Sequence, residues 1–438
     1  MIMEIKPFKA YRFNAKKVGD VGDCISPPYD VISPEQQEQL YSKSPYNIVR
    51  VIKGKDEAGD DGEKNKYMRA ADYLQSWINE EVLKQDLQEN LYAYVQDFEI
   101  AGMRVQRRGF IALAKLEEFG KMVQPHENTL EPPKEDRLRL TKATEAMFGL
   151  VFMLYEDPQR VADSIIERVI TGEPLIDFSD EQRVQHRLFM ISKKEQIEAI
   201  RQMMKDNPCI IADGHHRYET ALNYRKVNTN PAANYQMTAF VNTCHEGLMV
   251  LATHRLVKGV DGFTMEKLIS QLESEFEIER FEYDSPQGKT DAKRKMLEAM
   301  RTEFEKDGNA FGIYADDGTF YVAVLKNKNL MDGLVQDKSP AWRRLDVSIL
   351  HKAILEGKLG IDEEKLASAN YVKYVKDTDA AIDESIAAVD NGDFQAAFFM
   401  NPVKVQQIRE VAGAGEKMPQ KSTFFYPKFY SGLTINKL

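Results

Sequence analysis

The segment Ile210-Ile211-Ala212-Asp213-Gly214-His215-His216-Arg217-Tyr218-Glu219-Thr220-Ala221-Leu222 gives the clearest local fold signal of this chain and carries its most distinctive polar cluster. A short apolar run stops at Asp213-Gly214, and two histidines and an arginine follow before a helix-like pattern begins. We predict a strand that turns sharply into a helix, whose N-terminal N–H groups and positive dipole end attract an anion. Gly214 has no Cβ, so a ligand can approach the backbone closely.

The side chains of this segment favour phosphate or carboxylate binding. Arg217 offers a planar fork for such a group, and His215 and His216 can carry protons near neutral pH. The alternative is that Asp213 only caps the helix and that the histidines are surface groups. That alternative leaves the basic residues of the first helical turn unexplained, because a cation there opposes the helix dipole unless an anion is bound. We therefore predict an anion site at residues 213–217.

Length and composition describe a folded, acidic protein of more than one domain. The chain has 438 residues, of which 43% are hydrophobic and 29% are charged, and its net charge is −10. This charge argues against a dedicated nucleic-acid binder, which needs clustered positive charge. The three cysteines, Cys24, Cys209 and Cys244, fit neither a disulfide framework nor a zinc ribbon. No apolar stretch is long enough to cross a bilayer, and we expect a cytoplasmic protein without a membrane partner.

Hydrophobic periodicity predicts helices and strands that alternate along the whole chain. We expect strands at residues 45–52, 91–98, 104–113, 150–155, 235–242, 248–257, 310–314, 319–325 and 396–400. We expect helices at residues 63–83, 263–273, 289–304, 345–355 and 378–390, and also after Pro133 and before Asn207. The mixture predicts an α+β or mixed α/β fold with mixed sheets. We expect three parts, namely an N-terminal α/β region (1–122), a phosphate-binding core (123–260) and a C-terminal α/β region (261–438).

Two segments before the central motif carry candidate site residues. In Pro125-His126-Glu127 a carboxylate follows a proline-fixed turn. Glu127 suits a rigidly placed general base there, although a plain surface turn with a capping glutamate explains the segment equally well. Further on, Lys134, Arg137 and their basic neighbours could line a polyphosphate site. A solvated helix face with alternating charge is the simpler explanation for those residues.

Two further features concern phosphate and metal binding. Lys421, Ser422 and Thr423 resemble the end of a phosphate loop, but the glycines of that motif are absent. A buried C-terminal strand explains this segment better. No histidine pair has the helical spacing of a zinc protease, whereas a weakly held Mg²⁺ shared with phosphate suits carboxylates and water. Asp30 and Asp213 are its candidate ligands.

Several unusual motifs occur in the order typical of one prokaryotic family, the domain of unknown function numbered one thousand and fifteen, which the chain resembles over nearly its whole length. The motifs are Pro27-Pro28-Tyr29-Asp30-Val31-Ile32, Pro45-Tyr46-Asn47, His126-Glu127-Asn128-Thr129, Lys134-Glu135-Asp136-Arg137, Ala212-Asp213-Gly214-His215-His216-Arg217-Tyr218, Thr253-His254-Arg255 and Met418-Pro419-Gln420-Lys421-Ser422-Thr423. The His-Glu segment with Gly-His-His-Arg is also similar to the ParB/sulfiredoxin superfamily, which includes free serine kinases. This resemblance implies a ParB/sulfiredoxin-like core.

The same resemblance implies a small-molecule kinase that makes O-phosphoserine from free L-serine, with pyrophosphate, ADP or ATP as donor and Mg²⁺ as cofactor. Glu127 would be the base. The catalytic and donor-binding groups would be His126, Lys134, Arg137, Asp213, Gly214, His215, His216, Arg217, Lys421, Ser422 and Thr423. Phosphoryl transfer fits such residues because it needs positioning and charge neutralisation. A phosphohydrolase and a non-enzymatic nucleotide-binding or ParB-like regulator remain alternatives, and the acidic net charge disfavours the DNA-binding version.

Overall fold

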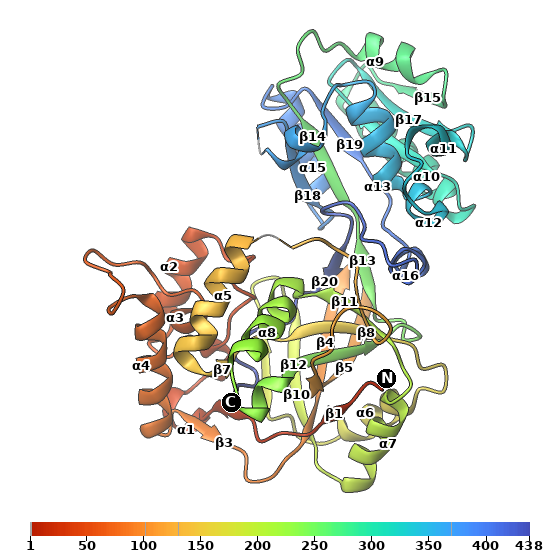
Figure 1. The fold of residues 1–438 in the computed structure, drawn as a ribbon. Coiled ribbons are helices and arrows are strands. Elements are labelled where there is room, and N and C mark those ends of the chain that lie inside the picture. The colour runs from red at the N-terminus through yellow and green to blue at the C-terminus, as the bar shows by residue number, and fades with distance from the viewer. Residues whose placement is uncertain (1, 101, 130, 369) are drawn as a thin grey trace. The chain divides into compact units, whose positions relative to one another are not determined.

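The computed structural model describes residues 2–100, 102–129, 131–368 and 370–438. It divides the chain into two compact units, which Figure 1 shows with their helices and strands labelled. The first unit consists of Met1–Leu248 and Pro427–Leu438, and the second consists of Met249–Tyr426. The expected division at residues 122 and 260 stays a prediction. None of the described helices is long and apolar enough to span a membrane.

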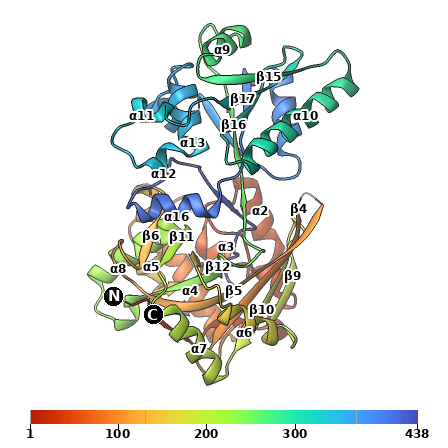
Figure 2. The same ribbon diagram turned by 90° about the vertical axis from the view of Figure 1, so that its right-hand side faces the viewer.

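The first unit is built on a nine-stranded mixed sheet, whose strand order is β6-β11-β8-β12-β5-β4-β10-β9, with β1 paired to β5. Its strands are β1 (Ile5–Lys6), β4 (Leu91–Ile100), β5 (Met103–Lys115), β6 (Val123–Pro125), β8 (Val151–Tyr155), β9 (Ile176–Ser179), β10 (Gln185–Ile191), β11 (Cys209–Asp213) and β12 (Tyr235–Asn242). The pairs β6–β11 and β8–β12 are parallel, whereas the other pairs are antiparallel. The predicted mixed α/β architecture is therefore confirmed, and Figure 2 shows the strands from another side.

Helices cover this sheet and extend the unit. They are α1 (Ala15–Val18), α2 (Pro34–Lys43), α3 (Val49–Ile52), α4 (Lys66–Asn79), α5 (Glu131–Thr144), α6 (Val161–Val169), α7 (Lys194–Met204) and α8 (His215–Val227), with 3-10 turns at Val21–Cys24 and Pro231–Asn234. Two small sheets pair β2 (Tyr11–Phe13) with β3 (Leu83–Gln85), and β7 (Ala146–Met147) with β21 (Asn436–Lys437). Helix α5 packs on both α8 and α4 (Figure 1). One apolar core lies under the sheet and a second lies among α2, α3 and α4.

The strand that we expected at residues 45–52 is wrong, because Val49–Ile52 form the short helix α3. The side chain of Asn47 accepts a hydrogen bond from the amide of Val49 at 2.9 Å and donates one to the carbonyl oxygen of Asp23 at 2.7 Å. These bonds close a turn where the sequence showed only alternating β-branched residues. A short, fully buried apolar run does not distinguish strand from helix by periodicity.

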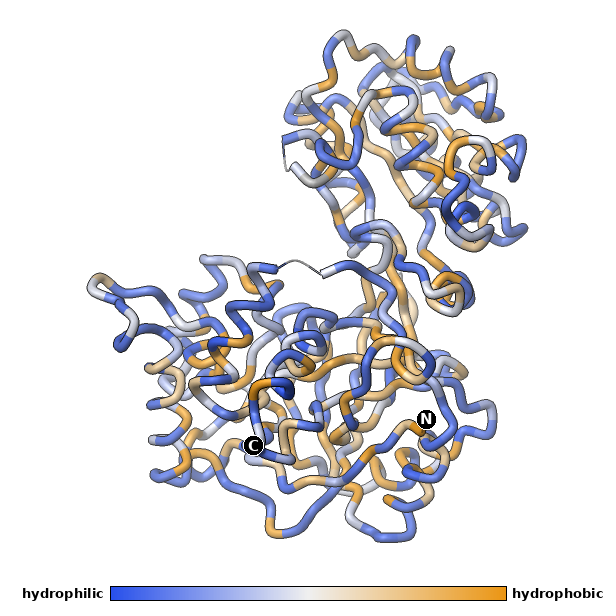
Figure 3. The backbone as a smooth tube through the Cα atoms, viewed as in Figure 1, coloured by the Kyte–Doolittle hydropathy of each residue, from blue (hydrophilic) through white to orange (hydrophobic). Residues whose placement is uncertain are grey.

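The second unit contains a six-stranded antiparallel sheet in the order β15-β17-β16-β19-β14-β18 and a separate pair of β13 with β20. The strands are β13 (Met249–Leu251), β14 (Thr253–Val257), β15 (Phe276–Glu282), β16 (Ala310–Tyr314), β17 (Thr319–Leu325), β18 (Val372–Lys376), β19 (Ala396–Phe399) and β20 (Phe424–Tyr426). The helices are α9 (Met265–Leu272), α10 (Pro286–Glu305), α11 (Leu330–Leu334), α12 (Pro340–Arg343), α13 (Asp346–Ile349), α14 (Glu363–Ala367), α15 (Ala381–Asp390) and α16 (Val405–Gly413), with a π-helical segment at Leu350–Glu356. In both units the apolar residues follow the inner strands (Figure 3).

Candidate active site

The central motif of the sequence forms the expected strand, turn and helix in the first unit. Residues 209–212 are buried in β11, which ends at Asp213, and α8 begins at His215. Gly214 lies between them with a φ of 89°, a left-handed conformation that costs other residues energy. A Cβ at this position would lie 3.0 Å from Nε of Arg217. The glycine is therefore required both by the turn and by the arginine that folds back over it.

Asp213 is held by two cations. Its Oδ2 accepts a hydrogen bond from Nη2 of Arg217 at 2.8 Å, and its Oδ1 accepts one from Nζ of Lys428 at 2.8 Å. Arg217 also donates through Nη1 to the carbonyl oxygen of Leu150. Burial raises the pKa of the Asp213 carboxyl, but Lys428 and Arg217 outweigh burial and hold that pKa well below its ordinary value. Asp213 is thus a fixed carboxylate that orients both cations.

This arrangement removes the capping alternative for Asp213 and corrects one expectation, which concerns Arg217. The N-cap position of α8 is Gly214, and Asp213 does not cap the helix through its side chain. Arg217, whose charge in the first helical turn seemed to require a bound anion, finds one within the chain in Asp213. Lys428 adds a second cation beside the same carboxylate. Two cations therefore converge beside the start of α8, where the helix dipole also favours an anion.

A pair of histidines lies next to Asp213. The backbone N–H of His126 donates to Nε2 of His215 at 3.3 Å, and the two rings are 4.8 Å apart at 64°. Nδ1 of His126 lies 2.5 Å from the carbonyl oxygen of Ile211, and it carries the proton because a carbonyl only accepts. Burial lowers the pKa of His126. Burial therefore favours the neutral form of His126, and its backbone N–H is held by the His215 ring.

Glu127 is placed near Asp213 by strand pairing. The parallel strands β6 and β11 are in register at Pro125 and Ile211, so Glu127 and Asp213 each lie two residues beyond that pair, at the same edge of the sheet. The Glu127 side chain is half-buried. Its negative charge acts on His126, and no hydrogen bond or ion pair connects its carboxylate to any described residue. The carboxylate is therefore available to accept a proton.

The turn at residues 27–32 brings Asp30 and Tyr29 to the same region. Burial lowers the pKa of His216, and the charge of Asp30 opposes that effect, so Asp30 lies within electrostatic range of His216. The guanidinium carbon of Arg137 lies 3.9 Å from the centre of the Tyr29 ring. Burial raises the pKa of Tyr29 to about 12. Tyr29 is a site residue that sequence reasoning missed, although it belongs to the quoted Pro-Pro-Tyr-Asp motif.

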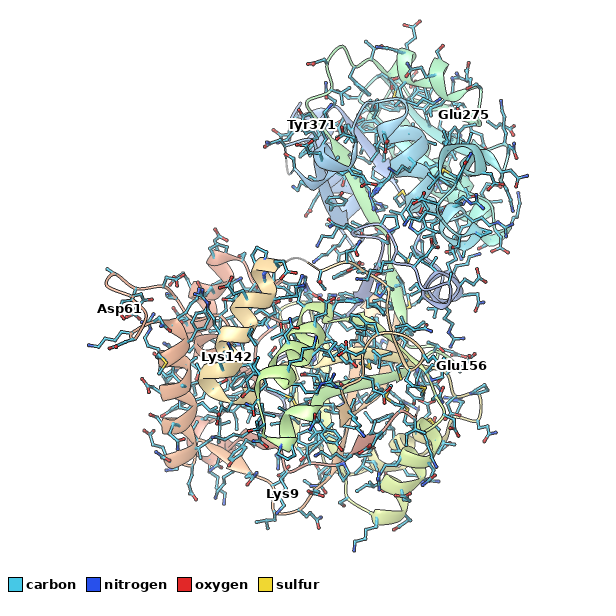
Figure 4. All side chains as sticks on the ribbon, viewed as in Figure 1. Lys9, Asp61, Lys142, Glu156, Glu275 and Tyr371 are labelled. Carbon is cyan, nitrogen blue, oxygen red and sulfur yellow. The ribbon has the colours of Figure 1, made fainter. Side chains whose placement is uncertain are left out.

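The basic residues of α5 divide into two groups. Lys134 is neutralised by carboxylates, with its Nζ 2.5 Å from Glu131 and 3.1 Å from Glu219, and Lys142 is exposed on the outer face of the helix (Figure 4). The alternating-charge interpretation describes these two residues well. Arg137 also pairs with a carboxylate, that of Asp136, but it differs in that it donates to the carbonyl oxygen of Ile52 at 2.7 Å and stacks on Tyr29.

A cavity of about 70 Å³ lies beside Arg217 and Arg137 in the first unit. Its wall is mostly apolar and includes Tyr29, Ile52, Leu140, Met147, Phe148, Tyr224, Gln236 and Ser431. A second cavity of about 150 Å³ shares Tyr29 and Arg137 with it and adds Lys53. Mostly apolar cavities with a few charged groups are typical of small-molecule sites.

Lys421, Ser422 and Thr423 belong to the second unit, and their role in donor binding stays a prediction. Ser422 is buried and its hydroxyl donates to the carbonyl oxygen of Pro419. The basic residue that joins Asp213 is instead Lys428, seven positions after Lys421. Lys428 was not among the predicted site residues, and it lies five positions beyond the Met418–Thr423 motif.

The residues that we expected to hold Mg²⁺ fit that ion poorly on their own. Among the described residues, no three His, Cys, Asp or Glu side chains form a group that could hold a metal. Both oxygens of Asp213 accept hydrogen bonds from cations, and Asp30 is a single exposed carboxylate. Mg²⁺ commonly binds through one or two carboxylates plus substrate phosphates, so most ligands here would have to come from the phosphate donor.

Comparison with known proteins identifies one matching family and several solved structures with distant similarity. The family model described as "Protein of unknown function (DUF1015)" matches residues 5–348. No curated protein matches the chain. A structure of a free serine kinase in complex with AMP is similar with 12% identity and a TM-score of 0.34, covering 72% of this chain and 93% of its own. SbnI from Staphylococcus aureus, with a C-terminal truncation, shows 10% identity and a TM-score of 0.33 over 73% of this chain and 84% of its own. A conserved hypothetical protein from Pyrococcus furiosus shows 14% identity and a TM-score of 0.31 over 72% and 94%.

Proposed function

The chain belongs to the DUF1015 family of proteins of unknown function, and from its own site geometry we propose that it is a small-molecule phosphotransferase. The observation that carries this proposal is the fixed carboxylate of Asp213 between Arg217 and Lys428. Two cations and a helix N-terminus converge at one point beside this carboxylate. Such a point suits a phosphoryl group, whose transfer depends on charge neutralisation more than on covalent chemistry.

The proposed reaction uses Glu127 as general base. The oxygen of an acceptor hydroxyl attacks the terminal phosphorus of the donor, and its proton passes to the Glu127 carboxylate. A new P–O bond forms to the acceptor while the bond to the leaving phosphate or nucleotide breaks. Arg217 and Lys428 neutralise the charge on the transferred group, with the first turn of α8 adding its dipole. His126, whose Nδ1 is held by the carbonyl oxygen of Ile211, positions His215 beside the transferred group.

For the substrates, we propose free L-serine as acceptor, so that the product is O-phosphoserine, and pyrophosphate, ADP or ATP as donor. Mg²⁺ enters with the donor as its complex, and Asp30, an exposed carboxylate within electrostatic range of His216, adds one protein oxygen ligand to it. We further propose that the β6, β11 and α8 region is a ParB/sulfiredoxin-like core. Both finer proposals rest on the sequence motifs given above.

The test is transfer of phosphate to serine by wild type and by two site variants. Glu127→Gln removes the base while keeping shape, and Arg217→Ala removes one cation. Glu173→Gln is the matched control, because Glu173 is an exposed glutamate of the same unit away from the site. We expect both site variants to lose transfer by about 100-fold or more and the control to equal wild type. Full transfer in both site variants would refute the assignment, and phosphate release without any acceptor would favour a hydrolase.

A further inference from the structure

The second unit contains a fully buried arginine, Arg255, on strand β14. Its exposed fraction is 1%. Nη1 donates to the carbonyl oxygen of Thr253, and Nη2 donates to that of Lys421 at 3.1 Å. Tyr374 is its direct neighbour on β18, with the ring centre 5.3 Å from the guanidinium carbon. The quoted Thr-His-Arg and Lys-Ser-Thr motifs therefore meet at this residue, although the proposed function uses neither.

Arg255 has no acidic partner among the described residues. Its contacts are two carbonyl oxygens and an aromatic ring, and its buried Nε is without a hydrogen-bond partner. Burial lowers the pKa of Arg255 to about 10, and no nearby carboxylate opposes that effect. A buried charge without a counter-ion is costly. An arginine kept in this state therefore points to an anion that is supplied from outside the chain.

His351 provides a second unsatisfied group near Arg255. It lies in the π-helical segment, is 7% exposed, and its buried Nε2 has no hydrogen-bond partner. Burial lowers the pKa of His351, and the charge of Arg255 lowers it further, so the two side chains are within electrostatic range. A neutral ring that carries its proton on Nε2 has a hydrogen-bond donor there, and this donor is unsatisfied. Short π-helical segments are frequent at functional sites.

Lys421 connects this buried pair to the surface of the second unit. Its side chain is exposed while its carbonyl oxygen bonds Arg255. The buried guanidinium of Arg255 is consequently in contact with the backbone of an exposed residue. With Lys421 and Arg255 both charged and His351 neutral, the local charge favours a doubly charged anion over a singly charged one.

We propose that the second unit carries an oxyanion site formed by Arg255, His351 and Lys421, which binds a phosphate-class dianion. Nε of Arg255 and Nε2 of His351 donate hydrogen bonds to its oxygens, and the ammonium of Lys421 approaches from the solvent side. This site is separate from the phosphotransfer site at Asp213, and its existence does not depend on that activity.

The test measures binding of inorganic phosphate to the full chain by calorimetry. The Arg217→Ala background removes one of the two cations of the first-unit site, and the change in affinity that Arg255→Met makes in this background reports the second unit. We expect phosphate to bind this variant, and Arg217→Ala with Arg255→Met to bind at least about tenfold more weakly. Acetate at the same ionic strength should bind the first variant much more weakly than phosphate. No phosphate binding by Arg217→Ala, or equal binding by both variants, would overturn the proposal.

A stability measurement separates the site from a purely structural arginine. In phosphate-free buffer we expect Arg255→Met to keep or raise the Tm, because an uncompensated charge is no longer buried. A structural arginine would give a lower Tm and an unchanged phosphate-induced shift, which contradicts the proposal. Should Arg255→Met not fold, Lys421→Gln removes an exposed charge and is expected to weaken phosphate binding several-fold. Lys295→Gln, at an exposed lysine on α10, is its control, and equal affinities in these two variants would also overturn the site.

Discussion

Nζ of Lys428 lies 2.8 Å from Oδ1 of Asp213, although 215 residues separate them in the chain. The chain leaves the first unit after Leu248 and returns at Pro427, and this returning segment supplies the lysine. The return is fixed by buried groups, since Gln96 donates to the carbonyl oxygen of Lys428 at 2.9 Å and Arg107 donates to that of Pro427. The proposed site is therefore complete only when the last residues pack against the sheet.

Replacing Lys428 by methionine is predicted to weaken donor binding and to make the site sensitive to acid. We expect roughly a 10- to 100-fold loss in donor affinity, because a charge-assisted contact disappears. The pKa of Asp213 is depressed in the folded protein. The ion pairs of Asp213 with Lys428 and Arg217 therefore stabilise the fold at high pH, and this stability is lost as the pH falls through the folded-state pKa of Asp213. In Lys428→Met that pKa rises, so the Tm should begin to fall at a higher pH than in wild type. Lys9→Met, at an exposed lysine (Figure 4), is the control, and identical acid profiles would contradict the role of Lys428.

Replacing Gly214 by alanine is predicted to lower the free energy of unfolding by more than backbone strain alone would. Gly59 has a similar φ of 94°, and a Cβ there would have no atom within 4 Å, whereas a Cβ at Gly214 meets Arg217. Gly59→Ala should therefore lose only about 1–2 kcal/mol of unfolding free energy. Gly214→Ala should lose more than that, and its kcat/KM should fall about 100-fold because Arg217 is displaced. Urea unfolding and transfer assays measure the difference, and equal values for the two alanine variants would show that Arg217 does not depend on the glycine.

The neutral state of His126 predicts a pH dependence of stability. Because its pKa is lowered in the folded protein, the unfolded chain binds more protons between the two pKa values, and stability rises with pH in that window. His126→Asn keeps a donor for the carbonyl oxygen of Ile211 but removes the titration. We expect the variant to lose less unfolding free energy than wild type as the pH is lowered from neutral through the ordinary histidine range, by up to about 1.4 kcal/mol per pH unit. An unchanged pH slope would mean that His126 is charged in the folded state.

The local structure of the central motif could be predicted from sequence because each signal is short-range. An apolar run, a glycine at the turn and a helical pattern lie within residues 210–222, and the structure places β11, Gly214 and α8 there. The same reasoning was wrong at residues 45–52, where Asn47 organises a helical turn through bonds to residues more than twenty positions away.

The charge balance of the site could not be predicted, because it depends on contacts between distant segments. Arg217 seemed to need an external anion, but Asp213 supplies one, and Lys428 from the C-terminal segment adds a second cation to the same carboxylate. Tyr29 and Arg137 meet by the packing of the N-terminal turn against α5, which no local pattern encodes. The sequence motifs indicated which segments take part in the site, whereas the contacts between those segments could be identified only from the folded structure.

The most direct test of the proposed activity is phosphorus NMR of the purified chain with Mg²⁺ and L-serine, with pyrophosphate, ADP and ATP supplied in separate samples. We predict that an O-phosphoserine resonance grows in at least one sample with wild type and is absent with Glu127→Gln. No phosphoserine with any of the three donors would contradict the serine kinase assignment.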